Sequence, residues 1–346
     1  MKSFRTEFSI DPSPHPIRHS DRLITMGSCF SEVIGEKLTQ SKFPVLVNPF
    51  GIIYNPISIF ELLSLSLRLQ KPETNLYLSR HGRNYHFQFH SRIHARSRED
   101  LEDLIQRRLQ EVYQMFSKCS QLMITLGTAF VFRHLSTGRI VANCHKQPSK
   151  QFQKERLSLD QILAAFDNCY RPLKKCNPDI RIVLTVSPVR HVKDGIPQNQ
   201  VSKSLLRLFC DEVVKRYEDI YYFPAYELQM DDLRDYRFYK DDLIHPNATA
   251  ENYIWEKFRA TFFEQHTLDI LSDLDQVRKN LNHRPFDPLS EAHFHFLNHL
   301  LQKIDQMPSE LNFSEERNGI LAQLQQIEAY LQHQKLNPGN ESKQIS

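Results

Sequence analysis

The chain has 346 residues, of which 40% are hydrophobic and 25% are charged, as in a globular protein with a substantial core. Its 44 basic and 41 acidic residues give a formal net charge of only +3, a field too weak to indicate a nucleic acid or an anionic membrane as a partner, and we expect neither nucleic-acid binding nor a membrane span. No apolar run approaches the roughly 20 residues of a membrane span, and the N-terminal residues lack the apolar centre of a secretory signal, so we expect a cytoplasmic protein. The six scattered cysteines predict free thiols rather than disulfides or a zinc ribbon.

Short apolar runs alternate with amphipathic segments over residues 1–265. Strands are expected at 22–26, 43–47, 121–126, 180–186 and 219–225. Several of these runs are apolar on both faces, which is typical of parallel strands covered by helices on two sides. Helices are expected between them, at 29–38, from Pro56 with Asn55 as cap, after the cap Ser97, from Ser158 in a capping box with Gln161, and over 200–217 and 249–264. The alternation predicts a doubly wound α/β domain.

Three further regions depart from this alternation. Hairpins are expected at 75–96 and 130–145, inserted into the α/β pattern. After residue 265 the pattern becomes purely helical, with segments at 267–283, 288–307 and 314–334. We therefore predict a helical extension over 266–333, followed by a polar, disordered tail over 334–346. The extension is a candidate element for assembly into a homo-oligomer.

Two nucleophilic side chains follow the first expected strand. The segment LITMGSCFSEV places Ser28 and Cys29 directly after an apolar run and Gly27, where a helix is expected to begin. In a doubly wound sheet, ligands bind at this carboxyl edge, and a helix N-terminus favours developing negative charge. Either side chain is therefore a candidate nucleophile with part of an oxyanion hole beside it. The alternative is that Ser28 only caps the helix and Cys29 is a small buried residue.

An Asp–x–x–His pair lies late in the α/β region. Asp242 precedes His245 by three residues, just ahead of the last expected helix of this region. At this spacing the carboxylate reaches the imidazole Nδ1–H and leaves Nε2 as a general base. Pro246 and Asn247 are expected to form a rigid turn and a helix cap. An early nucleophile and a late Asp–His pair at one sheet edge together predict nucleophilic catalysis.

Seven segments carry a resemblance to a known family. They are GSCF (27–30), NPFGIIYNP (48–56), TLGTAFVFR (125–133), VANCHKQP (141–148), SPVRHVKDG (187–195), PAYELQMDDLRDYRFY (224–239) and HPNATAENYIWEKF (245–258). Together they resemble the GSCFA-domain proteins, which look like a branch of the SGNH, or GDSL-like, hydrolases. The resemblance implies a flavodoxin-like parallel sheet and a Ser–His–Asp machinery acting on acyl esters. It identifies Asp242 and His245 with the last block, and Gly51 with the second-block glycine whose N–H holds the oxyanion.

The chain departs from the superfamily pattern in two blocks. The usual nucleophile stands two residues after the first-block glycine, which favours Cys29 and keeps Ser28 as the alternative. A thiol at a helix N-terminus is activated by a lowered pKa, whereas a serine needs only the base. The third block, residues 127–130, lacks the expected asparagine. Asn143 is the candidate for the missing amide donor, and His145 is a further candidate to line the site.

Other polar residues have weaker signals. His86 and His90 are expected on one face of a strand, and we interpret them as structural because no set with metal-ligand spacing completes them. Arg190 and His191 follow the fourth expected strand, where they contact an anionic part of a substrate or anchor their own loop.

These observations predict an acyl-ester hydrolase or acyltransferase that forms a covalent acyl-enzyme on Cys29 or Ser28. No metal or organic cofactor is expected, and the substrate class that the resemblance implies is a small-molecule or carbohydrate acyl ester. One alternative is a non-catalytic ligand-binding module that retains the SGNH fold, which the missing third-block asparagine favours. Another is a scaffold protein whose main element is the helical extension.

Overall fold

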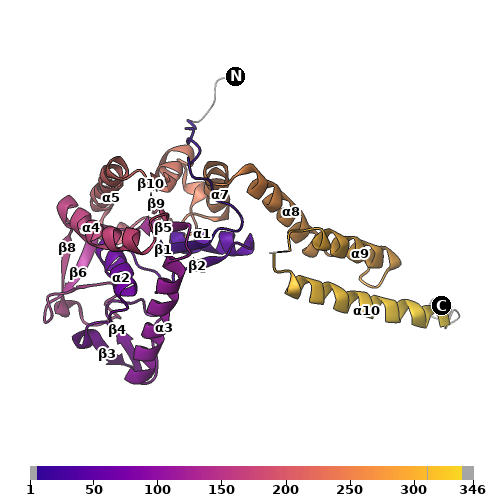
Figure 1. Ribbon diagram of the computed structural model, residues 1–346, viewed down its shortest axis with the longest axis horizontal. Helices are drawn as coiled ribbons and strands as arrows, with labels where there is room; N and C mark the ends of the chain where they lie inside the picture. The colour runs from indigo at the N-terminus through magenta and orange to yellow at the C-terminus, as the bar shows by residue number, and fades with distance from the viewer. Residues whose placement is uncertain (1–5, 310, 337–346) are drawn as a thin grey trace. The chain divides into compact units, whose positions relative to one another are not determined.

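The computed structural model describes residues 6–309 and 311–336, and the chain divides into two compact units with the boundary between Phe263 and Glu264. The first unit is an α/β domain with a parallel central sheet, and the second is helical (Figure 1). This confirms the predicted α/β class and the C-terminal helical region. No helix within the described residues is long and apolar enough to cross a bilayer.

Five strands form the central sheet, and each pairs in parallel with its neighbours in the order β10-β9-β5-β1-β2. They are β1 (Leu23–Gly27), β2 (Val45–Val47), β5 (Gln121–Leu126), β9 (Arg181–Val186) and β10 (Ile220–Tyr222). Counted along the chain, this is the order 2-1-3-4-5 of one common doubly wound arrangement, whose ligand site lies between the first and third strands. The edge strands β2 and β10 are shorter than predicted, and a proline, which has no N–H to donate to the ladder, lies beside each of them: Pro44 before β2 and Pro224 after β10.

Helices cover both faces of the sheet. They are α1 (Cys29–Gln40), α2 (Pro56–Arg68), α3 (Arg98–Phe116), α4 (Leu159–Cys176), α5 (Ile196–Arg216), the single turn α6 (Ala225–Glu227) and α7 (Ala248–Phe262). Helix α2 packs against α3 and α4, and α4 packs against α5, whereas α1 contacts α7 (Figure 1). The predicted caps are confirmed: Asn55 accepts the Ser58 N–H, and Ser158 and Gln161 form a capping box.

The two inserted hairpins are present, and the second carries a strand that the sequence did not predict. The first consists of β3 (Tyr77–Arg80) and β4 (Arg83–His86). The second consists of β6 (Phe130–His134) and β7 (Ile140–Val141), and β6 also pairs with β8 (Phe152–Arg156). The expected strand face shared by His86 and His90 is wrong, because β4 ends at His86 and the chain then turns, with the Phe89 N–H bonded to the His86 carbonyl.

The second unit consists of α8 (Gln265–Leu281), α9 (Glu291–Asp305) and α10 (Ser314–Leu336). Helix α9 packs against both α8 and α10, so the apolar faces that the sequence pattern predicts bury one another. The predicted tail begins too early, because α10 continues to Leu336; residues 337–346 lie outside the described residues. Assembly through these helices stays a prediction.

Candidate active site

The turn from β1 into α1 presents Cys29 at the carboxyl edge of the sheet. Gly27 ends β1 with a φ of +137°, and a Cβ on it would stand 2.1 Å from the Thr125 carbonyl oxygen of β5. Only glycine fits this close approach between the strands. The Gly27 N–H donates to the Asn48 Oδ1 at 2.9 Å, and the Ser28 N–H donates to the Thr125 carbonyl at 3.1 Å. These bonds fix the backbone from which Ser28 and Cys29 project.

Ser28 and Cys29 have different surroundings. The Ser28 side chain is fully buried, and its Oγ accepts the Phe30 N–H at 3.3 Å as the N-cap of α1. Cys29 is the first residue of α1, is partly exposed, and lines a cavity of about 680 Å³. The structure therefore brings the thiol to the cavity and places the hydroxyl in a capping role.

The surroundings of Cys29 shift the pKa of its thiol in two opposite directions. Burial raises its pKa, and this is the largest effect. Hydrogen bonds from the backbone N–H groups of Cys29 and Phe30, together with the charge of Lys203, act in the opposite direction. The net direction is upward, so the resting residue is a thiol whose deprotonation requires a base.

His245 and Asp242 form the predicted pair. The Asp242 Oδ2 lies 2.7 Å from the His245 Nδ1, and its Oδ1 accepts the backbone N–H groups of Ile244 and His245 at 2.8 and 3.0 Å. Those two backbone bonds are the main reason that the pKa of the exposed Asp242 carboxyl falls to about 2. The carboxylate is therefore charged at neutral pH and holds the imidazole with its Nε2 as the remaining ring nitrogen. Asn247 caps α7, as predicted.

One cavity collects residues from four separated parts of the chain. Cys29 comes from the start of α1, Asn143 from the loop after β7, Arg190 and His191 from the loop after β9, and His245 from the turn before α7. These are five of the residues predicted from sequence. The other four, Ser28, Gly51, His145 and Asp242, do not line this cavity.

His191 supplies a neutral ring in this cavity. Its backbone N–H donates to the Asn199 Oδ1 at 2.8 Å, and its ring meets the Tyr54 ring edge to face at 5.6 Å between centroids. Burial, assisted by the charge of Lys203, lowers the pKa of His191 to about 4. Among the described residues, its buried Nε2 has no hydrogen-bond partner. A neutral imidazole with an unpartnered nitrogen is suited to bind a polar atom of a ligand.

Lys203 is a buried neighbour of the site that interacts electrostatically with Cys29 and was not predicted from the sequence. It lies in α5 with only 1% of its surface exposed, and its Nζ donates to the carbonyls of Gly127 at 2.8 Å and Ser187 at 2.7 Å. These carbonyls follow β5 and β9, at the same edge of the sheet as Cys29. Burial lowers the pKa of Lys203 to about 7. The negative charge of a Cys29 thiolate acts in the opposite direction and raises this pKa. Lys203 precedes the buried Leu206 and Cys210 by three and seven residues, so helical spacing places it on the buried face of α5, and this is the signal that could have identified it.

We predict that Lys203→Met slows alkylation of Cys29 by iodoacetamide several-fold at mildly acidic pH, because the variant loses a cation that stabilises the thiolate. The difference shrinks as the pH rises above about 7, where Lys203 itself loses its proton. Mass-spectrometric rates measured across this range test the effect. Cys144 lines the same cavity and is the internal control, and an equal slowing at both thiols would contradict the prediction.

Of the two predicted oxyanion donors, Asn143 lines the cavity and Gly51 does not. The Gly51 N–H donates to the Asn48 carbonyl at 2.8 Å, so this structure does not offer it to a substrate. Gly51 instead allows close packing, since a Cβ at its φ of +76° would stand 2.5 Å from the His90 Cβ. Asn143 does line the cavity, and its Oδ1 accepts the His145 N–H at 2.8 Å. Its Nδ2 makes no hydrogen bond to the described residues and is available as a donor.

His145 has a structural position rather than the predicted place in the site. It is buried, with Nε2 3.0 Å from the His86 carbonyl and Nδ1 3.2 Å from the Ser91 Oγ. These contacts join the loop after β7 to the first hairpin. The His86 ring is buried in the same way and bonds to the Glu73 carbonyl at 3.0 Å, as its structural interpretation expects.

Burial lowers the pKa of both His86 and His145 to about 4, from an ordinary value of 6.5. Between these values the unfolded chain binds protons that the folded chain does not, so the free energy of unfolding falls as the pH falls below 6.5. We expect His145→Gln to reduce this dependence by about 1.4 kcal/mol per pH unit, the effect of one proton. Urea unfolding at a series of pH values measures the slope, and an unchanged slope would show that His145 is protonated in the folded state.

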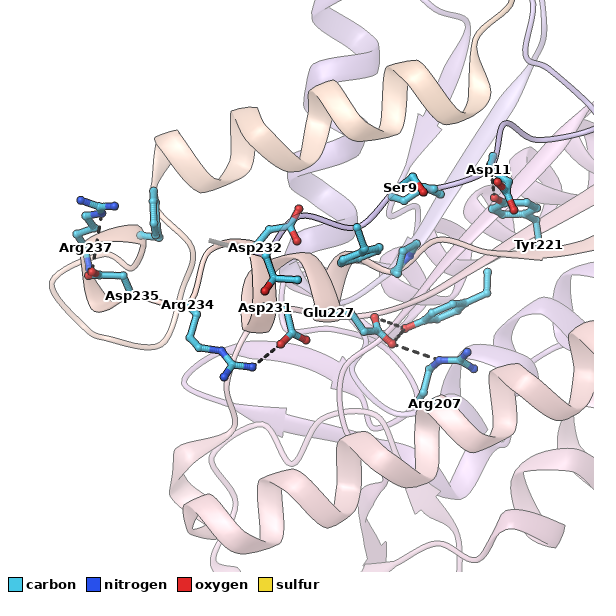
Figure 2. Close-up of a pocket in the computed structure, with 16 residues that line it drawn as sticks. Ser9, Asp11, Arg207, Tyr221, Glu227, Asp231, Asp232, Arg234, Asp235 and Arg237 are labelled. Atoms are coloured by element: carbon cyan, nitrogen blue, oxygen red, sulfur yellow. Dashed lines mark hydrogen bonds and ion pairs between the residues drawn. The ribbon is translucent and has the colours of Figure 1, made fainter. Parts of the chain in front are cut away.

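A larger cavity, of about 990 Å³, lies elsewhere in the first unit (Figure 2). Several of its charged side chains pair with one another: Arg207 with Glu227 at 3.2 Å, and Arg234 with Asp231. Tyr221 donates to the Asp11 carbonyl at 2.7 Å in the same wall. Neither Cys29 nor His245 lines this cavity. The candidate catalytic residues Cys29 and His245 therefore line the smaller cavity and not this one.

Comparison with known protein families gives separate matches for the α/β unit and for the helical unit. No curated protein matches the chain. The model of the GSCFA family matches residues 22–258, which include every element that contributes to the Cys29 cavity. A second family model, described as the C-terminal domain of GSCFA domain proteins, matches residues 274–326 within the helical unit. The first match alone covers more than half of the chain, and the chain therefore belongs to the GSCFA family.

Proposed function

We propose that this GSCFA protein is an SGNH-type acyl-ester hydrolase or acyltransferase that forms a thioester intermediate on Cys29. The observation that carries the proposal is that Cys29 and His245 line one cavity at the carboxyl edge of a parallel sheet. His245 is oriented by the Asp242 carboxylate at 2.7 Å. A nucleophile, a base and a group that orients the base are the parts that covalent acyl transfer requires.

Acylation begins with proton transfer from Cys29. The Asp242 carboxylate accepts the Nδ1–H of His245, so the Nε2 accepts the proton from the Cys29 Sγ. The sulfur forms a bond to the carbonyl carbon of the ester, and the electron pair of the carbonyl moves onto its oxygen. Because burial keeps the resting Cys29 as a thiol, this base is needed for attack at neutral pH.

The negative oxygen requires hydrogen-bond donors. The N-terminus of α1 supplies the Cys29 N–H and the positive end of the helix dipole. The Nδ2 of Asn143 is a second donor, in the role that the third-block asparagine has in the superfamily pattern. His191, neutral because its pKa is about 4, is a third donor in its Nε2–H tautomer. These groups replace the Gly51 N–H, which is occupied by the Asn48 carbonyl.

Collapse of the tetrahedral intermediate breaks the bond between the carbonyl carbon and the alcohol oxygen. His245 returns the proton to that oxygen, the alcohol leaves, and the acyl group remains on Cys29 as a thioester. Water then attacks in a hydrolase, or an acceptor hydroxyl in a transferase, with His245 taking the proton of the attacking group. The bond between the acyl carbon and the Cys29 Sγ then breaks, and His245 returns its proton to the sulfur, which regenerates the thiol in either reaction.

Covalent labelling with a fluorophosphonate and, separately, a thiol-directed acylating probe tests this proposal. The expected result is labelling of Cys29 by the thiol-directed probe that is strongly reduced in His245→Ala, whereas the serine-directed fluorophosphonate should not label Ser28. Cys144 lines the same cavity without an oriented base and is the matched control. Labelling of Cys29 that is independent of His245 would contradict the proposal and favour the alternative of a ligand-binding module.

A further inference from the structure

The cavity that contains Cys29 carries more positive than negative charge. Its charged lining residues are Lys154, Arg190, Lys193 and Asp194. Lys154 and Asp194 form an ion pair with each other. Within residues 6–309 and 311–336, neither Arg190 nor Lys193 has a carboxylate within ion-pair distance, so two cationic side chains border the cavity without an anionic partner.

Arg190 is held in place by contacts that leave its charge uncompensated. Its Nη1 donates to the Leu243 carbonyl at 2.9 Å, and its backbone N–H donates to the Ile244 carbonyl at 3.2 Å. Its guanidinium lies over the rings of Tyr236 and Tyr239, 5.8 and 5.6 Å from their centroids. These contacts fix the planar group, while one carbonyl bond uses only one of its five N–H donors.

The guanidinium also borders a second cavity. This space, of about 240 Å³, is lined by the segment from Tyr226 to Tyr239 and shares Arg190 and Val192 with the Cys29 cavity. The carbonyl of Leu243 that holds Arg190 lies two residues before His245. Arg190 is therefore fixed at the wall between two cavities and is tied to the turn that carries the general base.

We propose that the substrate is an ester that carries a negatively charged group, and that Arg190 binds this group while Cys29 attacks the ester carbonyl. Carboxylate and phosphate oxygens are the acceptors that match the fork of donors in a guanidinium. The inference rests on the proposed acyl-transfer function and adds to it the charge of the substrate. Without an anionic substrate, Arg190 would serve only to anchor its loop to Leu243, and it would not affect the choice between charged and neutral esters.

Two matched pairs of esters test this inference. In the first pair the charge is on the acyl group: mono-4-nitrophenyl adipate against 4-nitrophenyl hexanoate. In the second pair it is on the alcohol: 3-acetoxybenzoate against phenyl acetate. For each pair, the ratio of kcat/KM for the charged ester to that for the neutral ester is measured for the wild type and for Arg190→Gln, Arg190→Lys and Lys193→Gln.

We expect the wild type to prefer the charged ester in at least one pair, and Arg190→Gln to lower that ratio by about tenfold, as loss of one charge-assisted hydrogen bond predicts. Arg190→Lys keeps the charge and is expected to retain part of the preference. Because the readout is a ratio within each variant, a general loss of activity does not affect it. Lys193→Gln reports the effect of removing an unanchored cation from the same cavity.

The possible outcomes separate this inference from the proposed function. Hydrolysis of both esters with the same ratio in the wild type and Arg190→Gln would overturn the inference and leave acyl transfer standing. Equal losses of preference in Arg190→Gln and Lys193→Gln would also overturn it, since a general positive field would then explain the preference. Failure of every ester to acylate Cys29 would contradict the proposed function itself.

Discussion

Cys29→Ala is expected to lower kcat/KM for 4-nitrophenyl ester cleavage by about 10⁴-fold or more, because removal of a nucleophile leaves only binding and the oxyanion donors. Ser28→Ala should retain most of the activity, since the Ser28 hydroxyl is fully buried and caps α1. Its expected cost is instead about 1 kcal/mol in the free energy of unfolding, the usual effect of losing an N-cap. The two adjacent residues therefore have opposite predicted consequences.

Initial rates with 4-nitrophenyl acetate and urea unfolding of the same preparations measure both effects. Cys144→Ala removes a second thiol from the same cavity and should leave the rate near that of the wild type. The reverse pattern, in which Ser28→Ala inactivates the protein and Cys29→Ala does not, would show that the hydroxyl attacks and that the turn before α1 rearranges to expose it.

Asp242→Asn is the second change with a large expected effect. The asparagine side chain is the same size, but it cannot accept the Nδ1–H of His245 with a full negative charge. In serine-protease triads the corresponding change lowers kcat by about 10⁴-fold, because the imidazole adopts the wrong tautomer. Exposure to solvent here should make the loss smaller, on the order of 10²-fold or more.

The charge on the carboxylate supports this orienting role. The pKa of Asp242 is about 2, so the carboxylate stays ionised at every pH above that value and keeps its charge beside His245 across the neutral range. His245→Ala should abolish the activity. Equal rates for the wild type and Asp242→Asn would contradict a role for the 2.7 Å pair in catalysis.

Local signals in the sequence predicted the frame of the site. Asn55 with Pro56 and Ser158 with Gln161 marked helix starts that the structure confirms, because caps depend on residues three or four apart. The Asp242–His245 bond was predictable for the same reason, since both groups lie within one turn. Buried apolar strands such as β5 were equally clear.

The remaining features depend on contacts between distant residues. Lys203 lies more than 70 positions from Gly127, and its burial follows from how α5 packs over the ends of β5 and β9. Gly51 loses its N–H to Asn48, a turn bond that a family pattern does not reveal. His145 was predicted near the site from its neighbour Asn143, but the chain directs its ring towards Ser91 and the first hairpin.

The most direct test of this account is mass spectrometry of the acyl-enzyme. The wild type and His245→Ala are mixed with 4-nitrophenyl acetate, quenched in acid and digested, and the peptide that spans residues 23–42 is sequenced. We expect an acetyl thioester on Cys29 in the wild type, removed by neutral hydroxylamine and absent from His245→Ala. An acetyl group on Ser28, or acetylation of Cys29 to the same extent in both proteins, would contradict base-assisted attack by Cys29.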